Sequence, residues 1–376
     1  MIKKIFWIAG EKSGDLHASI VLQKLKDLKP DWVNFGIGGP HMQEFGFKPL
    51  FPFERFSVMG FSEILKHILF FWKVEKKIKN IFRQNSPDLI ILVDYPGLNM
   101  RIAKMAESFQ IPVLYFISPQ FWAWKYKRIF KLKKFTDQIA YILPFEKKYF
   151  AKHEVNSVYV GHPIAEEIEI NLNKIDFAKK YKLNSNKKWL GFLPGSRDNE
   201  IKKMLPEYLK AMTEFNPETH EFLLSRASSV NDDVFKSFLK EAKTQPKIIE
   251  SDRYEMIKHS DFMVVTSGTA TIETAFLGTP FLIAYRTSKL SYELGKRFIK
   301  IDRIGLPNIV LDKDLIPELI QNEVNGVNIA ANIKRFLESE IEYEEMKNEL
   351  KEIHDLLQKK TASTEVAKIV TELIDE

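Results

Sequence analysis

The stretch IFWIAGEKSGDLHASIVLQKLKDL, residues 5–28, decides the fold class of this chain. Its first five residues, Ile5–Ala9, are apolar and are followed at once by Gly10, which predicts a buried strand that ends in a turn. From Ser13 to Leu28 the apolar residues recur with a helical period, so we expect a helix after the turn. A buried strand that leads through a glycine turn into a helix is typical of a parallel sheet covered by helices.

The same alternation continues along most of the chain. Further strands are expected at Leu89–Val93, Val113–Ile117, Gln138–Ile142, Ser157–Val160, Trp189–Leu193, Glu221–Leu224, Lys247–Glu250, Phe262–Val265 and Phe281–Tyr285. Helices are expected at Asn99–Phe109, Asn199–Phe215, Asp232–Lys243 and Thr269–Leu277, among others. We therefore predict an α/β protein with doubly wound parallel sheets.

The alternation pauses once, between Gly161 and Lys188, where a Gly-His-Pro turn leads into a polar stretch rich in Asn and Lys. We interpret this stretch as the connection between two domains, residues 1–165 and 186–330, which suits a chain of 376 residues. Residues 331–376 show helical periods only and are expected to form closing helices. Because ligands of such sheets bind beyond the carboxyl ends of the strands, we expect the site in a cleft between the domains.

The composition excludes several classes of protein. The absence of cysteine excludes disulfide scaffolds, Cys-ligated zinc and thiol nucleophiles. Residues 1–167 carry 25 Lys and Arg against 16 Asp and Glu, whereas the remaining residues carry 31 against 34. The first half is therefore expected to prefer an anionic partner, namely a phosphate, an acidic lipid surface or nucleic acid. The apolar run Ile5–Ala9 is too short for a signal peptide, and no run of about 18 apolar residues predicts a transmembrane helix.

Residues 61–82 predict an unusual helix. Its apolar residues are Phe61, Ile64, Leu65, Ile68, Leu69, Trp72, Ile78 and Phe82, and its apolar surface is widened by Phe70, Phe71 and Val74. Four lysines accompany its second half: Lys73, Lys76, Lys77 and Lys79. A wide aromatic face beside cations suits a helix that lies in a membrane interface or holds acyl chains. A well-buried core helix fits the pattern equally well.

Three loops of the first half follow predicted strands and carry unusual residues. In Gly10-Glu11-Lys12-Ser13-Gly14-Asp15 the glycines permit close backbone approach, and Ser13 is a candidate helix cap. The amides of this loop form a candidate anion site, with a plain tight turn as the alternative. Asp94 stands before a Pro-Gly turn and is a candidate general base, with helix capping as the alternative.

The third loop contains Trp122 and Trp124, which would be costly to expose without a purpose. Six cations follow within ten positions: Lys125, Lys127, Arg128, Lys131, Lys133 and Lys134. Aromatic and cationic side chains together suit contact with phosphate, sugar or interfacial lipid. The alternative is a solvated helix whose aromatic residues are packed into the core.

Two loops of the second half resemble anion-binding helix starts. Gly195, Ser196 and Arg197 end a predicted strand and are candidates to bind a diphosphate, although Arg197 could instead pair with Glu200. Ser267, Gly268 and Thr269 begin another helix, and Glu273, one turn further, could bind both hydroxyls of a ribose. The alternative for this second loop is a capping pattern of Thr269 with Glu273.

Several other site types have no support. The eight histidines show no H-x-x-x-H spacing and no matched carboxylates, so no metal site is expected. No G-x-S-x-G elbow is present, which leaves hydrolase chemistry unsupported. Gly36–Gly39 forms a weak phosphate loop and a good turn, and His162 is more typical of a hinge than of a ligand.

Ten segments in order along the chain resemble the lipid-A-disaccharide synthase family of bacterial glycosyltransferases. They are GEKSGD (Gly10–Asp15), GIGGPHM (Gly36–Met42), SVMGFSEIL (Ser57–Leu65), DYPGLN (Asp94–Asn99), SPQFWAW (Ser118–Trp124), LPFE (Leu143–Glu146), GHP (Gly161–Pro163), LPGSR (Leu193–Arg197), SGTATIE (Ser267–Glu273) and LPN (Leu306–Asn308). Lys12 fills a variable position of the first motif, and Leu98 stands where Phe is common in the fourth.

The resemblance implies a GT-B architecture of two Rossmann-like domains, with the acceptor lipid and membrane on the first domain and the UDP-sugar on the second. It implies inverting transfer of 2,3-diacylglucosamine from UDP-2,3-diacylglucosamine to 2,3-diacylglucosamine 1-phosphate, which yields a β1→6 disaccharide and UDP. In the family's pattern Asp94 matches the essential aspartate and Arg197 the essential arginine, while Glu273 would bind ribose and Asn308 lies in the nucleotide region. Glu11 stays open as the alternative base, and no cofactor or metal is implied.

Further expectations concern partners and location. We expect a cytoplasmic protein in peripheral contact with the inner face of an anionic membrane, whereas the paired anion loops and Glu273 speak against nucleic acid as the partner. A homodimer, the acyl-chain length and the resting domain arrangement are left open. The alternative function is that of another GT-B enzyme, a UDP-N-acetylglucosamine transferase or 2-epimerase, which would share the nucleotide loops but would not need Trp122, Trp124 or the surface of residues 61–82.

Overall fold

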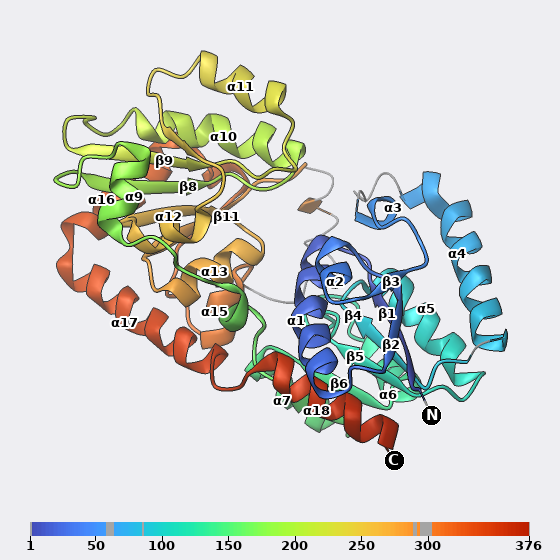
Figure 1. Cartoon of the computed structure of the whole chain (residues 1–376). Helices are drawn as coiled ribbons and strands as arrows, with labels where there is room; N and C mark the ends of the chain where they lie inside the picture. Colours follow the sequence, from blue (N-terminus) through green and yellow to red (C-terminus); the bar gives the residue numbers. More distant parts are fainter. Residues whose placement is uncertain (1, 58–63, 85, 289–291, 294–302, 376) are drawn as a thin grey trace. The chain divides into compact units, whose positions relative to one another are not determined.

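The computed structural model describes residues 2–57, 64–84, 86–288, 292–293 and 303–375. The chain folds into two compact units (Figure 1). Unit 1 consists of residues 1–166 together with residues 358–376, and unit 2 consists of residues 167–357. Each unit is an α/β layer structure in its own right.

Unit 1 is built on a parallel sheet of seven strands in the order β3-β2-β1-β4-β5-β6-β7. The strands are β1 (Lys4–Ala9), β2 (Val33–Ile37), β3 (Lys48–Pro49), β4 (Leu89–Val93), β5 (Val113–Phe116), β6 (Gln138–Tyr141) and β7 (Ser157–Tyr159). The central strands β1 and β4 pair in parallel from Ile5 opposite Leu89 to Ala9 opposite Val93. All of these paired residues are fully buried, which explains why both strands are apolar throughout.

The helices of unit 1 cover this sheet. They are α1 (Lys12–Leu28), α2 (Pro40–Glu44), α3 (Glu54–Ser57), α4 (Ile64–Gln84), α5 (Pro96–Glu107), α6 (Arg128–Phe135), α7 (Lys147–Lys152), α8 (Ile164–Glu167), α18 (Ala362–Asp375) and the short 3₁₀ helix η1 (Pro144–Glu146). The C-terminal α18 lies beside α1 (Figure 1). Glu166 holds the start of α18, because its carboxylate accepts hydrogen bonds from both the amide (2.9 Å) and the hydroxyl of Ser363.

Unit 2 contains a parallel sheet of six strands in the order β10-β9-β8-β11-β12-β13. The strands are β8 (Lys188–Leu193), β9 (His220–Ser225), β10 (Lys247–Ile249), β11 (Phe262–Thr266), β12 (Phe281–Tyr285) and β13 (Glu318–Ile320). The helices are α9 (Lys174–Tyr181), α10 (Asp198–Met212), α11 (Asp232–Lys240), α12 (Arg253–His259), α13 (Thr269–Leu277), α15 (Leu306–Leu311), α16 (Gly326–Glu338), α17 (Glu340–Leu357) and the 3₁₀ helix η2 (Gln321–Glu323).

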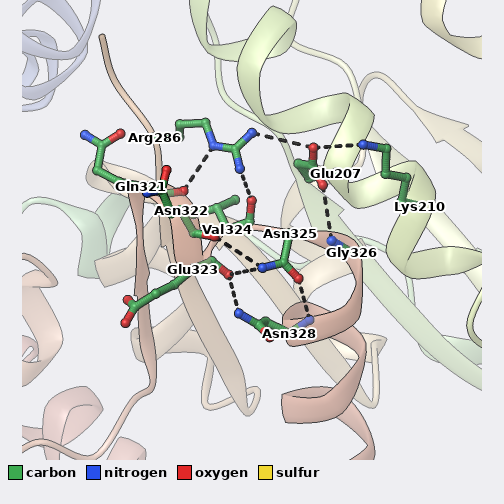
Figure 2. Close-up of polar contacts among 10 residues, drawn as sticks. All are labelled: Glu207, Lys210, Arg286, Gln321, Asn322, Glu323, Val324, Asn325, Gly326 and Asn328. Carbon is green, nitrogen blue, oxygen red and sulfur yellow. Dashed lines mark hydrogen bonds and ion pairs between the residues drawn. The ribbon is translucent and has the colours of Figure 1, made fainter. Parts of the chain in front are cut away.

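A polar cluster around Arg286 holds the edge of the second sheet at which β13 lies (Figure 2). Arg286 follows β12 and donates to two backbone carbonyls of the segment after β13, those of Gln321 (3.1 Å) and Val324. Its guanidinium also lies 3.5 Å from Glu207 of α10, whose carboxylate accepts from the amide of Gly326 at 3.2 Å. Helix α10 is thereby linked to the ends of β12 and β13 and to the start of α16.

The ten strands expected from the sequence and the doubly wound α/β class are confirmed. Strands β2, β3 and β13 were not expected. Gly36 and Ile37, which we predicted to form a turn, lie in β2, and a Cβ at Gly36 would come within 2.2 Å of the Trp7 carbonyl. The polar residue of β2, Asn34, is accommodated because it accepts a hydrogen bond from the Trp7 indole at 2.8 Å.

The helices after residue 331 do not form one group. The rest of α16 and all of α17 belong to unit 2, whereas α18 belongs to unit 1. The chain passes from the first unit to the second near residue 167, within the polar stretch that we interpreted as the connection. The two units are therefore not consecutive pieces of sequence, because the last helix completes the first unit.

Candidate active site

The carboxyl ends of strands β1, β4, β5 and β6 lie along one edge of the sheet of unit 1, because these strands are parallel neighbours. The loops that follow them contain Glu11, Asp94, Ser118 and Glu146 respectively. The structure thus brings the loops that we selected from the first half of the sequence to a single edge.

Asp94 has an unusual backbone conformation. Both Asp94 (φ +46°) and Tyr95 (φ +45°) are in the left-handed region, which is unfavourable for residues with a Cβ. The carbonyl oxygen of Asp94 accepts two hydrogen bonds that hold this conformation, from the Asn99 side-chain amide at 2.7 Å and from the Tyr115 hydroxyl at 2.6 Å. Strained backbone that its surroundings hold in place is typical of functional sites.

The protonation of Asp94 is shifted towards neutral pH. Burial raises the pKa of its carboxyl to about 6, and the negative charge of Glu11 adds to the increase. His17 and the backbone amide of Tyr95 act in the opposite direction. At pH 7 this carboxylate is therefore mostly ionised, yet it is a stronger base than an exposed aspartate.

The glycine loop after β1 is only partly as expected. Helix α1 begins at Lys12 with Glu11 as its N-cap residue, and no side chain caps it, so the prediction that Ser13 caps this helix is wrong. The ring of Tyr95 lies against Gly10, where a Cβ would come within 2.9 Å of it, whereas a Cβ at Gly14 would find only ordinary contacts. The close approach predicted for the two glycines is therefore seen at Gly10.

Asp15 has a structural role that the sequence did not predict. Its buried carboxylate accepts hydrogen bonds from three backbone amides at the start of α2, those of Gly39 (2.7 Å), His41 (3.1 Å) and Met42 (3.3 Å). A Cβ at Gly39 would collide with that carboxylate at 2.6 Å. The motifs Gly10–Asp15 and Gly36–Met42 thus contact one another through this carboxylate. The Gly-Pro pair at the start of α2 could have indicated a helix start in need of a capping group.

The two tryptophans of the third loop have different environments. Trp122 is buried, with its indole edge-on to Phe145 at 4.8 Å, which agrees with the alternative of an aromatic residue packed into the core. Glu146 accepts hydrogen bonds from the Trp122 indole at 3.2 Å and from the Ser118 hydroxyl at 2.7 Å. Burial raises the pKa of the Glu146 carboxyl to about 7. Trp124 is exposed, and the cations of Lys125 (4.4 Å) and Arg128 (4.7 Å) lie against its ring.

In unit 2 the loop after β8 contains the ion pair of Arg197 with Glu200, which we considered as the alternative to diphosphate binding. Arg197 Nη1 lies 2.9 Å from Glu200 Oε1, and the other carboxylate oxygen accepts from the amides of Ser196 (2.8 Å) and Arg197 (3.3 Å). Gly195 adopts φ +111°, and a Cβ there would come within 2.4 Å of Glu200. The Arg197 side chain is nevertheless 74% exposed, so most of its donors face solvent.

The loop after β11 presents a helix start without a side-chain cap. Gly268, with φ +156°, is the N-cap residue of α13, and both Gly268 and Thr269 are exposed. Glu273 does not cap this helix, because its Oε1 accepts from Arg253 Nη2 at 2.7 Å and lies 3.5 Å from the Tyr254 hydroxyl. The capping alternative is therefore wrong, and Arg253 is a neighbour of Glu273 that no sequence motif indicated.

Asn308 is buried and its amide is used within the protein. Its Nδ2 donates to the Ile316 carbonyl and to Glu318 Oε1, both at 2.8 Å, and its Oδ1 accepts from the Ile316 amide at 3.0 Å. These bonds join the start of α15 to β13. The structure thus shows a structural role for Asn308, and direct contact with a nucleotide stays a prediction.

His162 of unit 1 is buried. Its Nδ1 accepts from the amide of Ile164 at 3.2 Å, and burial lowers the pKa of its imidazole to about 3, so the ring is neutral. No group of three or more His, Cys, Asp or Glu within the described ranges is placed to hold a metal ion.

The architecture defines a class of protein. Over its whole length the chain resembles solved structures of the two-domain GT-B fold. One is a UDP-GlcNAc 2-epimerase from Neisseria meningitidis bound to UDP-GlcNAc, with a TM-score of 0.66, 13% identity and 99% of each chain covered. Another is the calicheamicin glycosyltransferase CalG4, with a TM-score of 0.62, 12% identity, and 100% of this chain and 99% of that chain covered. Two α/β units, each built on a parallel sheet, are the architecture of the GT-B fold.

Comparison with protein families and curated relatives places the chain in one family of this class. The family profile described as lipid-A-disaccharide synthetase matches residues 5–371. A lipid-A-disaccharide synthase of Geobacter metallireducens is 35% identical over 375 residues, covering 99% of this chain and 97% of its own length. That of Trichlorobacter lovleyi is 37% identical over 339 residues, covering 89% and 88%. The chain belongs to the lipid-A-disaccharide synthase family and is a glycosyltransferase.

Proposed function

We propose that this protein transfers 2,3-diacylglucosamine from UDP-2,3-diacylglucosamine to the 6-hydroxyl of 2,3-diacylglucosamine 1-phosphate. The products are the β1→6 disaccharide 1-phosphate and UDP. Family membership along the chain carries the assignment of the reaction. Asp94, on a strained and doubly hydrogen-bonded turn, is the observation that supports a base in unit 1.

The carboxylate of Asp94 acts as the general base. It accepts the proton of the acceptor hydroxyl as that oxygen bonds to the anomeric carbon and the bond from this carbon to the UDP oxygen breaks. A single displacement inverts the anomeric centre and needs no covalent sugar–enzyme intermediate. The pKa of about 6 suits this role, because the group is ionised at neutral pH and still has useful basicity. Glu11, exposed at the start of α1, is the alternative base.

Unit 2 binds the nucleotide of the donor. The exposed guanidinium of Arg197 and the amides of Gly195 and Ser196 bind the diphosphate, and they stabilise the charge that develops on the leaving UDP. The uncapped start of α13, from Ser267 to Thr269, supplies further amides. Glu273 accepts hydrogen bonds from the ribose, oriented by Arg253. No cofactor or metal is assigned to the reaction.

Contact with the membrane is proposed through α4. Phe71, Val74, Ile78 and Phe82 of this helix are buried, whereas Leu69 is 73% and Trp72 is 61% exposed. Phe61 lies outside the described residues, as does most of the Ser57–Leu65 motif, and the side chains of Ile64, Leu65 and Ile68 are not described either. Among the described helices, none is long and apolar enough to cross a bilayer. We propose peripheral attachment to the inner face of an anionic membrane, with the lysines of α4 near its phosphates.

The proposed reaction is tested with the purified protein and both lipid substrates in mixed micelles. We expect formation of UDP and disaccharide in equal amounts, and loss of turnover with retained UDP binding in Asp94→Asn. Absence of product from the wild type would refute the assignment. Incubation with UDP-N-acetylglucosamine alone tests the alternative of a 2-epimerase, which is supported only by the similarity of fold.

A further inference from the structure

Three buried polar atoms of unit 1 have no hydrogen-bond partner among the described residues. They are the hydroxyl of Tyr95, Oδ1 of Asn99 and Nη1 of Arg128. Tyr95 and Asn99 begin α5, Arg128 begins α6, and these two helices pack against one another. Because buried polar groups are nearly always hydrogen-bonded, each of these atoms can take a further polar partner.

Two cations meet at the indole ring of Trp124. The guanidinium of Arg128 lies 4.7 Å and the ammonium of Lys125 lies 4.4 Å from the centre of the Trp124 ring. Lys125 itself adopts φ +56°, an unfavourable backbone conformation for a residue with a Cβ. Burial and the nearby Arg128 lower the pKa of Lys125, and burial lowers that of Arg128. The indole thus keeps two like charges close together.

In the part of the chain that the structure describes, no carboxylate forms an ion pair with Lys125 or Arg128. Other cations nearby are paired, as Arg101 with Glu75 at 2.8 Å and Lys133 with Glu154 at 3.4 Å. Two adjacent cations that lack a counter-charge, one of them with an unsatisfied buried donor, are suited to bind an anion with two charges.

These cations are connected to the proposed base through Tyr115. The hydroxyl of Tyr115 donates to the Asp94 carbonyl at 2.6 Å, and the charge of Arg128 acts on the same hydroxyl by opposing the rise of its pKa. The cation pair therefore lies on the same strand-end edge as Asp94. A ligand with a hydroxyl at Asp94 could place an anionic group at Arg128 without leaving this edge.

We propose that Arg128 and Lys125 bind the phosphate monoester of the acceptor sugar, while Trp124 positions both cations. The proposal rests on the proposed function and deepens it, because it assigns the part of unit 1 that recognises the phosphorylated acceptor. The guanidinium of Arg128 can donate charge-assisted hydrogen bonds to a phosphate, and Lys125 adds a point charge. Specificity for a phosphorylated acceptor over the same sugar without phosphate would then reside in these two side chains.

The test compares two acceptors, 2,3-diacylglucosamine 1-phosphate and 2,3-diacylglucosamine, in wild type and Arg128→Gln. The preference is the ratio of kcat/KM for the two acceptors at saturating donor. We expect Arg128→Gln to reduce this preference roughly 10- to 100-fold, which corresponds to the loss of a charge-assisted hydrogen bond. The KM for the UDP-sugar should stay within about twofold of the wild-type value. Lys131→Gln, which removes an exposed cation of the same helix, is the matched control and should leave the preference unchanged.

A folded Arg128→Gln variant that keeps the wild-type preference would overturn the proposal. If thermal melting shows that this variant does not fold, Lys125→Gln takes its place, because Lys125 is exposed, and an unchanged preference overturns the proposal in the same way. If the wild type forms no disaccharide, the proposed function is refuted. The phosphate site is then tested separately, by calorimetric measurement of the affinity of wild type and variants for the phosphorylated acceptor. Equal binding by wild type and Arg128→Gln would then contradict it.

Discussion

The hydroxyl of Tyr115 lies 2.6 Å from the carbonyl oxygen of Asp94 and donates a hydrogen bond to it. Tyr115 is on β5 and Asp94 follows β4, so the bond crosses between two neighbouring strands at their carboxyl ends. Together with the amide of Asn99, it holds Asp94 in a left-handed conformation that the chain would otherwise avoid. The geometry of the proposed base is therefore determined by its main chain.

Removal of this bond should lower activity more than stability. In Tyr115→Phe the ring still fills its buried position, so we expect a loss of about 1 kcal/mol in the free energy of unfolding. We expect kcat to fall roughly tenfold, because the Asp94 carboxylate is less well placed. Denaturant unfolding and steady-state kinetics measure the two effects. A variant with unchanged kcat would show that Asn99 alone is sufficient to hold the turn.

The rate should depend on pH through Asp94. A general base acts in its ionised form, so a pKa of about 6 predicts that kcat/KM is constant above about pH 7 and falls about tenfold per unit below pH 6. Removal of the Glu11 charge, which adds to the raised pKa, should shift this inflection to lower pH in Glu11→Gln. An inflection that instead disappears in Glu11→Gln would identify Glu11 as the base.

Glu146 should make stability depend on pH. Its folded pKa of about 7 exceeds the ordinary value of 4.5, so between these values the folded state binds more protons than the unfolded state. Stability from this group is therefore present at low pH and lost as the pH rises towards 7. In Glu146→Gln, which resembles the protonated carboxyl, that loss should be absent. We expect the variant to gain on the order of 2–3 kcal/mol relative to wild type between pH 5 and pH 8. A constant difference in unfolding free energy across this range would contradict the assignment.

Glu200 should weaken the binding of UDP. Its carboxylate occupies the amide of Ser196 and one nitrogen of Arg197, groups that we assign to the diphosphate. Glu200→Gln keeps an acceptor for the amide and removes the opposing charge. We therefore expect the Kd for UDP to fall about two- to fivefold, within the range of an exposed ion pair. The matched control is Glu214→Gln, an exposed residue of the same unit. Weaker binding by Glu200→Gln would instead mean that Glu200 orients Arg197 for the nucleotide.

The exposed apolar residues of α4 should determine attachment to membranes. We expect the double variant Leu69→Ser and Trp72→Ala to bind vesicles of phosphatidylglycerol at least about tenfold more weakly, because it loses two large apolar side chains from the interface. Its melting temperature should stay unchanged, since both residues are exposed. Vesicle sedimentation measures the binding, with Val327→Ser, an exposed apolar residue of unit 2, as the control. Equal binding by the double variant and wild type would exclude α4 as the contact.

The sequence by itself determined ten of the parallel strands and the loops that follow them. A strand buried on both faces must be apolar throughout, as Leu89–Val93 is, and a tight turn after it needs Gly or Pro. These signals are local, so they can be found without knowledge of the fold. Strand β2 was missed because Asn34 and Gly36 interrupt its apolar pattern, and both are tolerated only through their contacts with Trp7.

Only the tertiary structure decided which polar and aromatic residues support the fold and which are open to a ligand. Trp122 is buried because Glu146, 24 positions further along the chain, accepts its indole hydrogen. Asp15 binds the amides of α2, Glu273 pairs with Arg253, and Nη1 of Arg128 has no hydrogen-bond partner among the described residues. The physical reason is the same in each case. Burial and pairing depend on groups that folding brings together from distant parts of the chain, and no local pattern records them.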